Sequence, residues 1–372
     1  MSKSSNSTAA IATVPATPTP SAEEDAKASA RQVGLRYVHD DKPGITRKPA
    51  KKGFDYFDKD GKAVRDAEVI ERINKLAIPP AWTEVWICPS ANGHIQATGR
   101  DVKQRKQYRY HARWRSVRDE LKYDRMIGFG RALPALRRKV DAAMSLPGLP
   151  REKVLATLVY LLQATMMRIG NEEYARTNKS FGLTTLRNKH VEISGAKVEF
   201  AFRGKSGVNH AIKLSDARLA RIIKRMRELP GQELFQYIDD EGERHTIGSA
   251  DVNDYLHQAT GEEYTAKDFR TWSGTVLAAL ALQEFEAFDS EAQAKKNIVL
   301  AIESVAKKLG NTPAICRKCY VHPTVLDAYL DGTTLNAIKQ RTSEKLRKEL
   351  DTLTAEEGAV LAFLQERLER KS

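Results

Sequence analysis

The chain has few cysteines and no long apolar run, and both features narrow the kind of protein it can be. Among its 372 residues, only Cys88, Cys316 and Cys319 are cysteines. An odd number of cysteines in a long chain favours a reducing compartment over a disulfide framework. The longest mostly apolar stretch, Val154 to Met167, is flanked by charged residues and is shorter than the ~20 helical residues that cross a bilayer. The sequence therefore excludes disulfide-stabilised and membrane-spanning folds.

Three functional signals are also missing or incomplete. The first residues are Ser, Thr, Ala and Pro without a cationic segment leading into an apolar one, so we expect no secretory signal and a cytoplasmic protein. Gly204-Lys-Ser-Gly207 lacks the spacer and the preceding glycine of a P-loop, so no motif supports ATP chemistry. Cys316-Arg-Lys-Cys319 has the spacing of a metal half-site or a redox pair but lacks a second cysteine pair. Since structural zinc usually needs four ligands, unligated thiols are favoured there.

What the chain does have is positive charge. Its 61 Lys and Arg residues against 48 Asp and Glu give a formal net charge of +13. Such an excess favours a polyanionic partner, nucleic acid first, although cations also serve solubility. Hydrophobic residues make up 41% of the chain, enough for each of about two domains to bury a core.

Composition divides the chain into a tail and two domains. Residues 1–33 are poor in aromatics and rich in Ala, Ser, Thr and Pro, which predicts a disordered, flexible tail. Residues 34–118 alternate strand-like runs with Asp60-Gly61 and Asn92-Gly93 turns, which favours a small β-rich domain. A linker is expected near residues 116–124, and residues 119–372 then form a mostly helical domain.

Helical spacing marks the predicted helices of this second domain. We expect helices over 135–144, up to Met167, and over 215–229, 249–259, 273–287 and 290–309, with two more at the C-terminus. Thr354 followed by Glu357 predicts a capping box at the start of the last one.

One β island interrupts the helices. Residues 191–193, 198–202 and 208–214 alternate apolar and polar side chains and are separated by glycine-containing turns. They predict three antiparallel strands with Lys205 at a hairpin tip. The expected fold class is therefore α+β, a β-rich N-terminal domain plus a mostly helical domain with a three-stranded antiparallel sheet.

Several polar residues could carry chemistry, and each also has a plain structural interpretation. The stretch 100–115 interleaves cations with Tyr and Trp, which suits phosphate and base contacts or a solvated strand face. Arg168 follows an apolar helix, where a cation offsets the helix dipole. Lys205 and Arg270 could be surface cations, and Tyr320 a core aromatic.

The order of these residues is more specific than any one of them. The segments, in order, are Arg105-Lys-Gln-Tyr-Arg-Tyr110, Arg168-Ile-Gly, Gly182-Leu-Thr-Thr-Leu-Arg-Asn-Lys-His-Val-Glu-Ile193, Gly204-Lys205, Lys267-Asp-Phe-Arg270-Thr and Leu309-Gly-Asn-Thr-Pro-Ala-Ile-Cys-Arg-Lys-Cys-Tyr320. Together, from about residue 84 to about residue 330, the chain resembles the type IB DNA topoisomerases, especially the compact poxviral and bacterial enzymes. The resemblance implies the fold that these enzymes share with tyrosine recombinases.

The resemblance also implies a role for particular residues. Tyr320 is the expected nucleophile, Arg168 and Arg270 the pair that grips the scissile phosphate, and Lys205 the general acid for the leaving 5′ oxygen. Expected DNA contacts, most of them in the N-terminal domain, are Arg105, Gln107, Tyr108, Tyr110, Tyr174 and Lys267. Where poxviral enzymes have a His, this chain has Asn311, whose amide can donate a hydrogen bond but cannot titrate near neutral pH. We therefore expect transition-state hydrogen bonding there rather than acid–base catalysis.

The implied activity is relaxation of positive and negative supercoils in double-stranded DNA by a monomer. One strand is cut through a 3′-phosphotyrosyl intermediate and resealed, so no ATP, metal or other cofactor is expected. A tyrosine recombinase remains the nearest alternative, since Tyr320-Val-His322 resembles its Tyr-x-His, although Lys267 stands where its His-x-x-Arg has the His. A catalytically inactive, architectural DNA-binding protein is the second alternative.

Overall fold

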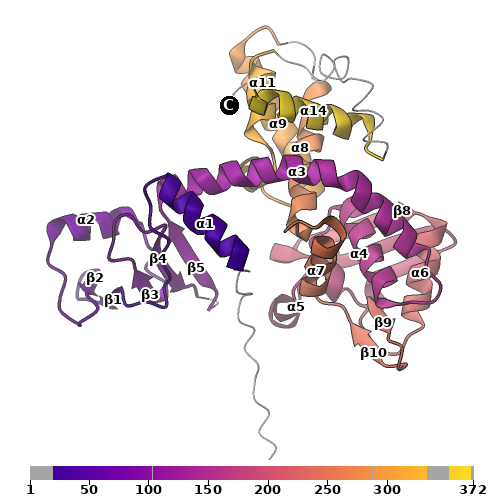
Figure 1. Ribbon diagram of the computed structural model, residues 1–372, viewed down its shortest axis with the longest axis horizontal. Helices are drawn as coiled ribbons and strands as arrows, with labels where there is room; N and C mark the ends of the chain where they lie inside the picture. The colour runs from indigo at the N-terminus through magenta and orange to yellow at the C-terminus, as the bar shows by residue number, and fades with distance from the viewer. Residues whose placement is uncertain (1–19, 103, 286–287, 333–351, 370–372) are drawn as a thin grey trace, which may run out of the picture. The chain divides into compact units, whose positions relative to one another are not determined.

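The computed structural model of the protein describes residues 20–102, 104–285, 288–332 and 352–369 (Figure 1). Contacts between Cα atoms divide the chain into two units, Met1–Lys122 and Tyr123–Ser372. The architecture is α+β with small antiparallel sheets, so the predicted fold class is confirmed. In the part of the chain that the structure describes, no helix is long and apolar enough to cross a membrane.

A five-stranded antiparallel sheet forms the N-terminal unit. Its strands, in spatial order, are β2 (Phe54–Phe57), β1 (Ile45–Pro49), β3 (Thr83–Ile87), β4 (Ile95–Arg100) and β5 (Lys106–Tyr110). Ile45, Ile87 and Ala97 pack with Ile73 of helix α2 (Ala67–Lys75) into a small core. Strand β5 lies at the edge of the sheet and carries the basic aromatic stretch.

Two sequence predictions for this unit differ from the structure. Helix α1 (Pro20–Gln32) lies within the segment expected to be a tail, because burial of Ala30 against Leu35 and Trp114 offsets the cost of ordering it. Residues 1–19 of that predicted tail lie outside the described residues. Helix α3 (Ala112–Met144) runs through the predicted linker at 116–124, since no proline or glycine interrupts residues 112–127.

Helix α8 (Ala266–Gln283) is the central element of the C-terminal unit. It packs against α4 (Arg151–Thr165), α9 (Glu291–Leu309), α11 (Pro323–Leu330), α14 (Ala355–Glu369) and α7 (Ser249–Thr260). Helix α4 is apolar on nearly every side, and burial of each of its leucines stabilises the unit by roughly 1.5–3 kcal/mol. The predicted capping box is confirmed, because Thr354 and Glu357 each accept the other's backbone N–H, at 3.2 and 3.0 Å.

The predicted three-stranded sheet is also present. Strands β6 (Val191–Ser194), β7 (Lys197–Arg203) and β8 (Asn209–Ser215) pair antiparallel in that order, and helix α6 (Ala217–Arg227) packs on β7. Short 3₁₀ turns lie at Leu183–Thr185 and Asn188–His190, and a third, η3 (Lys205–Gly207), joins β7 to β8. A second sheet, β9 (Gln236–Ile238) with β10 (Arg244–Thr246), was not predicted.

Candidate active site

Most predicted site residues of the C-terminal unit line one pocket of about 330 Å³. The pocket lies between the end of α4, the short helix α5 (Glu172–Asn178), the β7–β8 hairpin, the first turns of α8 and the end of α10 (Pro313–Cys319). The predicted residues that line it are Arg168, Tyr174, Lys205, Lys267, Arg270 and Tyr320. Segments far apart in the sequence thus meet around a cationic pocket.

Arg270 is buried where three helices meet. Thr265 and Asp268 cap the start of α8, and Arg270 follows in its next turn with only 4% of its surface exposed. Its Nη1 donates to the Met166 carbonyl beyond α4, and its Nη2 donates to the Leu309 carbonyl at the end of α9, at 2.8 Å. A cation is favoured at both helix C-termini, so the fold fixes the guanidinium in place.

Arg168 lies beside Arg270 because helix α4 ends abruptly. Met166 adopts a left-handed conformation (φ 55°) that turns the chain, and Arg168 emerges half-buried. Its Nη2 donates to the Gly310 carbonyl at 3.1 Å and also to the Asn311 Oδ1. Burial, and then the charge of Arg270, lower the pKa of Arg168 from its usual value.

Tyr320 ends α10 and faces Arg270. Its N–H donates to the Cys316 carbonyl at 2.9 Å, and the Arg270 guanidinium carbon lies 5.1 Å from the centroid of its ring. The ring is half-buried. A cation over the face of the phenol is an attractive arrangement.

Helices α8 and α3 fix the chain just after this tyrosine. Gly274, one turn along α8 from Arg270, leaves room for the Tyr320 carbonyl, since a Cβ there would lie 2.6 Å from that oxygen. The Thr275 hydroxyl donates to the same carbonyl at 3.3 Å and accepts the N–H of His322 at 3.0 Å. The Tyr123 hydroxyl donates to the Val321 carbonyl at 3.1 Å. Sequence reasoning missed these contacts, since they join residues far apart in the chain.

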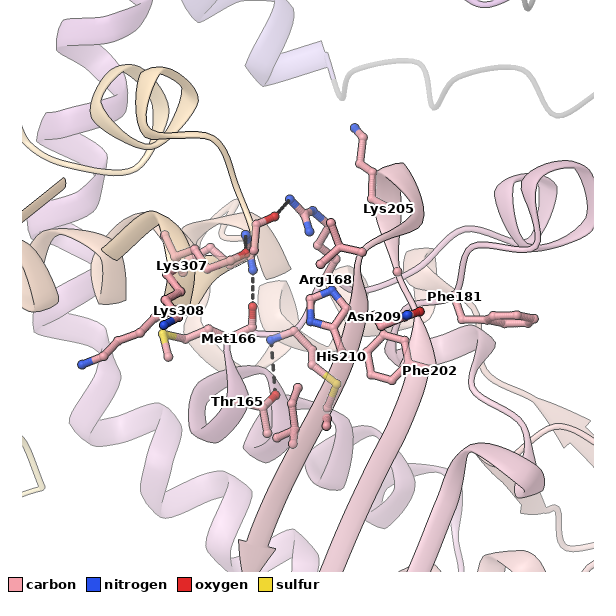
Figure 2. Close-up of a pocket in the computed structure, with 18 residues that line it drawn as sticks. Thr165, Met166, Arg168, Phe181, Phe202, Lys205, Asn209, His210, Lys307 and Lys308 are labelled. Carbon is pink, nitrogen blue, oxygen red and sulfur yellow. Dashed lines mark hydrogen bonds between the residues drawn. The ribbon is translucent and has the colours of Figure 1, made fainter. Parts of the chain in front are cut away.

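Lys205 is held far more loosely. It lies on η3 at the predicted hairpin tip and is exposed. Its ammonium nitrogen is 6.0 Å from the centroid of the Tyr174 ring, and its side chain points away from Arg168 (Figure 2). The structure therefore places Lys205 on the pocket wall with its charge directed elsewhere.

Asn311 lies in the turn between α9 and α10 and is joined to the pocket through Arg168. Its N–H donates to the Ala306 carbonyl at 2.9 Å, and Thr312 next to it caps α10. Within the described residues, two buried donors near the arginine pair lack a hydrogen-bond acceptor, the Asn311 Nδ2 and the Arg270 Nε. Such donors are rare and call for an explanation.

A second cavity, of about 250 Å³, adjoins the first and shares Arg168, Lys205 and Arg270 with it (Figure 2). Its wall includes His210 of β8, which sequence reasoning missed. Burial, and then the charges of Arg168 and Arg270, lower the pKa of His210. The only signal in the sequence was the alternation of residues 208–214, which puts alternate side chains on one face of the sheet.

The remaining predicted DNA contacts lie on and before strand β5 of the N-terminal unit. Tyr108 and Tyr110 share one face of the strand and stack with their ring centroids 5.7 Å apart, and Tyr108 is 38% exposed. Asp101 accepts from Gln107 at 3.1 Å and pairs with Arg105 at 2.5 Å. The strand thus presents an aromatic pair beside a cation held by a carboxylate.

Two cysteines and one histidine lie close to Tyr320 in the chain. Cys316 is fully buried, which raises the pKa of its thiol to about 11, and Cys319 is half-exposed. The His322 Nδ1 accepts the N–H of Thr324 and so caps α11, at 3.1 Å. Across the described ranges, no group of three or more His, Cys, Asp and Glu side chains is arranged to hold a metal ion.

Comparisons with known proteins bear on both units. The family model for the catalytic core of eukaryotic DNA topoisomerase I matches residues 111–350, and that for the N-terminal domain of bacterial DNA topoisomerase IB matches residues 53–101. DNA topoisomerase 1B of Acanthamoeba polyphaga mimivirus is 35% identical over 293 residues, covering 77% of this chain and 87% of the relative. DNA topoisomerase 1B of Vaccinia virus (strain Copenhagen) is 24% identical over 313 residues, 78% of this chain and 94% of the relative. DNA topoisomerase 1 of Rabbit fibroma virus (strain Kasza) is 25% identical over 307 residues, 76% of this chain and 91% of the relative.

Proposed function

Since this chain belongs to the type IB DNA topoisomerases, we propose that it relaxes supercoiled DNA by cutting and resealing one strand through a covalent bond to Tyr320. The observation that supports this most is the pocket in which the Arg270 guanidinium faces the Tyr320 ring, with Arg168 beside it. Two buried donors without acceptors belong to Arg270 itself and to Asn311, which accepts from Arg168.

Tyr320 acts as the nucleophile in this proposal. Negative charge develops on the attacking oxygen, and cations fixed beside it stabilise that charge. Arg270 lies 5.1 Å from the ring, and Arg168 adds a second charge. Tyr320 loses its phenolic proton to water, and its oxygen forms a bond to phosphorus as the bond from phosphorus to the 5′ oxygen breaks, which leaves a 3′-phosphotyrosyl link.

Arg168, Arg270 and Asn311 stabilise the phosphorane. Negative charge grows on the non-bridging oxygens during in-line displacement, and planar guanidinium groups match that geometry. A buried donor without an acceptor costs about 1–3 kcal/mol. If the Arg270 Nε and the Asn311 Nδ2 turn towards a bound phosphoryl oxygen, binding the transition state removes a cost that the free enzyme carries.

Lys205 gives a proton to the departing 5′ oxygen, which is a poor leaving group as an alkoxide. Its exposed position on η3 lets the ammonium move from the Tyr174 ring towards the bound strand. In religation the 5′ hydroxyl attacks the phosphotyrosyl phosphorus, its proton returns to Lys205, and Tyr320 leaves. The phosphotyrosyl link conserves the energy of the phosphodiester, so the reaction uses no ATP, metal or other cofactor. The stress in the supercoiled DNA drives the relaxation of both positive and negative supercoils.

Both units contact double-stranded DNA in this account. In the N-terminal DNA-binding domain, Arg105, Gln107, Tyr108 and Tyr110 contact the duplex, and Tyr174 and Lys267 contact it beside the pocket. We propose a monomer that associates with nucleoid DNA in the cytoplasm. Because phosphate contacts release counterions, DNA affinity should fall steeply between about 50 and 200 mM salt, and a flat response in a filter-binding titration would contradict the DNA contacts.

Plasmid relaxation tests the proposed activity. The parent and Tyr320→Phe are incubated with negatively and positively supercoiled plasmid in EDTA without ATP. The parent is expected to relax both signs, and Tyr320→Phe neither, while both bind DNA. Relaxation by Tyr320→Phe, or a requirement for a metal ion or ATP, would refute the mechanism. Strand exchange between two duplexes without relaxation would favour a recombinase. DNA binding without any cleavage would favour an architectural protein.

A further inference from the structure

His210 lies close to the turn of the β7–β8 hairpin, on the wall of the cavity next to the active-site pocket (Figure 2). It pairs in register with Phe202 of β7, and the two rings stack with centroids 5.0 Å apart and planes 20° apart. Phe202 is buried, so it forms a fixed floor for the imidazole. Within the described residues, no hydrogen bond holds the ring, so packing against its neighbours keeps it in place.

Two glycines lie against the edge of this ring. A Cβ at Gly204 would lie 2.6 Å from the Cδ2 and Nε2 atoms of His210, and a Cβ at Gly310 would lie 2.9 Å from its Cε1. Both distances are shorter than side chains tolerate, so the ring fills the space that the glycines leave. The backbone of both segments therefore rests directly on the imidazole.

Each of these glycines precedes a residue of the proposed chemistry. Gly204 is followed by Lys205, and Gly310 by Asn311. The Gly310 carbonyl also accepts from the Arg168 Nη2 at 3.1 Å. The imidazole thus lies between the corner that carries Lys205, the proposed general acid, and the turn that carries Asn311, the proposed hydrogen-bond donor to the phosphate.

The charges around His210 favour its uncharged form. All charged side chains that line its cavity are cations, namely Arg168, Lys205, Arg270, Lys307 and Lys308. Burial and the two arginines lower the pKa of His210. The ring therefore acts as a flat spacer that adds no repulsion to the arginine pair.

We propose that His210 is a positioning residue, whose ring sets the spacing between the Gly204–Lys205 corner and the Gly310–Asn311 turn and so fixes the backbone positions from which both side chains reach the scissile phosphate. The inference rests on the roles proposed above for Lys205 and Asn311. It assigns His210 no contact with DNA and no proton transfer.

Single-turnover cleavage of a duplex with one mapped cleavage site tests this, with either oxygen or sulfur at the bridging 5′ position. A sulfur leaving group departs without a proton, so it removes the need for Lys205. His210→Ala removes the spacer, and we expect about 10- to 100-fold slower cleavage of the oxygen substrate, with DNA affinity within about twofold of the parent. On the sulfur substrate the loss of cleavage rate relative to the parent should be at least about fivefold smaller, since only the misplacement of Asn311 still slows the reaction.

His210→Phe supplies the conservative variant, because phenylalanine keeps a flat ring that can stack on Phe202. It should cleave within about threefold of the parent, since shape rather than a nitrogen atom is required. The matched control is His245→Ala, which removes a histidine stacked on Tyr237 in the β9–β10 sheet, with centroids 5.1 Å apart and outside the active-site pocket. It should cleave at the parent rate.

The outcomes separate this inference from the mechanism beneath it. If Lys205→Ala is slow on oxygen but gains nothing on sulfur, the general-acid role fails and the inference fails with it. If Lys205→Ala recovers on sulfur while His210→Ala matches the parent on oxygen, only the positioning role is wrong. Equal losses for His210→Ala on both substrates, or a His210→Phe as slow as His210→Ala, would also overturn it. His210→Val, which favours a strand, replaces His210→Ala if that variant does not fold.

Discussion

The arginine pair and the hairpin lysine are held in opposite ways within one pocket. Arg270 is buried and donates to the carbonyls of Met166 and Leu309, and Arg168 donates to the Gly310 carbonyl. Lys205 is exposed, and its ammonium lies over the Tyr174 ring at 6.0 Å. Groups that stabilise charge gain from being fixed beforehand, because no reorganisation is then needed during the reaction. A proton donor on an exposed tip can instead approach after DNA has entered.

The difference predicts that Arg270 serves both stability and catalysis. Arg270→Ala removes the proposed phosphate ligand and leaves two carbonyls without a donor, so we expect adduct formation about 10³- to 10⁵-fold slower, by analogy with arginine fingers. Each orphaned carbonyl should cost about 1–3 kcal/mol of unfolding free energy. Rapid-quench cleavage and urea unfolding measure the two effects. Arg270→Lys keeps the charge, but one ammonium cannot reach both carbonyls, so its cleavage rate and stability should also fall. A cleavage rate and stability equal to those of the parent would contradict the account.

Lys205 should affect the rate alone. Lys205→Ala is expected to slow cleavage by about 10²- to 10⁴-fold, the usual contribution of a general acid. Its unfolding free energy should match that of the parent, because the side chain is exposed and packs against little. A loss of stability comparable to that of Arg270→Ala would remove the contrast between the two regions.

Asn311 tests whether the fixed part of the pocket includes an uncharged donor. Asn311→Ala should slow cleavage by about 10²- to 10³-fold, as the loss of one oxyanion donor does, with little change in DNA affinity. The rate should fall by the same factor at pH 6 and pH 8, since an amide does not titrate there. Cleavage at the parent rate would remove Asn311 from the site.

The smallest effect is expected at Gly274, which acts through the backbone of Tyr320. Gly274→Ala would put a Cβ 2.6 Å from the Tyr320 carbonyl oxygen and shift the proposed nucleophile, so we expect about 10- to 100-fold slower cleavage. Gly358→Ala in helix α14 is the matched control, because a Cβ there meets no atom within 4 Å. That control should cleave like the parent, and equal rates in both variants would contradict the close contact.

Local patterns predicted much of the fold. The alternation of residues 191–214 gave the three strands with Lys205 at their tip, and Thr354 with Glu357 gave a capping box, because both signals depend on neighbours in the chain. Helix α1 was missed, since its composition suggests disorder while its burial depends on Trp114, far along the sequence. The predicted linker failed for the converse reason, because residues without helix breakers continue one long helix.

The candidate site divides in the same way. Family resemblance picked out Arg168, Lys205, Arg270 and Tyr320, and these residues line one pocket. The resemblance did not predict that Arg270 would donate to two backbone carbonyls, or that Gly274 would leave room for the Tyr320 carbonyl. Those contacts exist only after α4, α8 and α9 have packed together, so no local pattern in the sequence encodes them.

The central claim is that Tyr320 alone forms the covalent bond to DNA. The most direct measurement is mass spectrometry of the peptide that stays attached after the parent protein is trapped on a cleaved duplex with denaturant and digested. The account predicts a phosphodiester between the Tyr320 oxygen and the 3′ end of the broken strand, and no adduct with Tyr320→Phe. A link to another residue, or to the 5′ end, would contradict it.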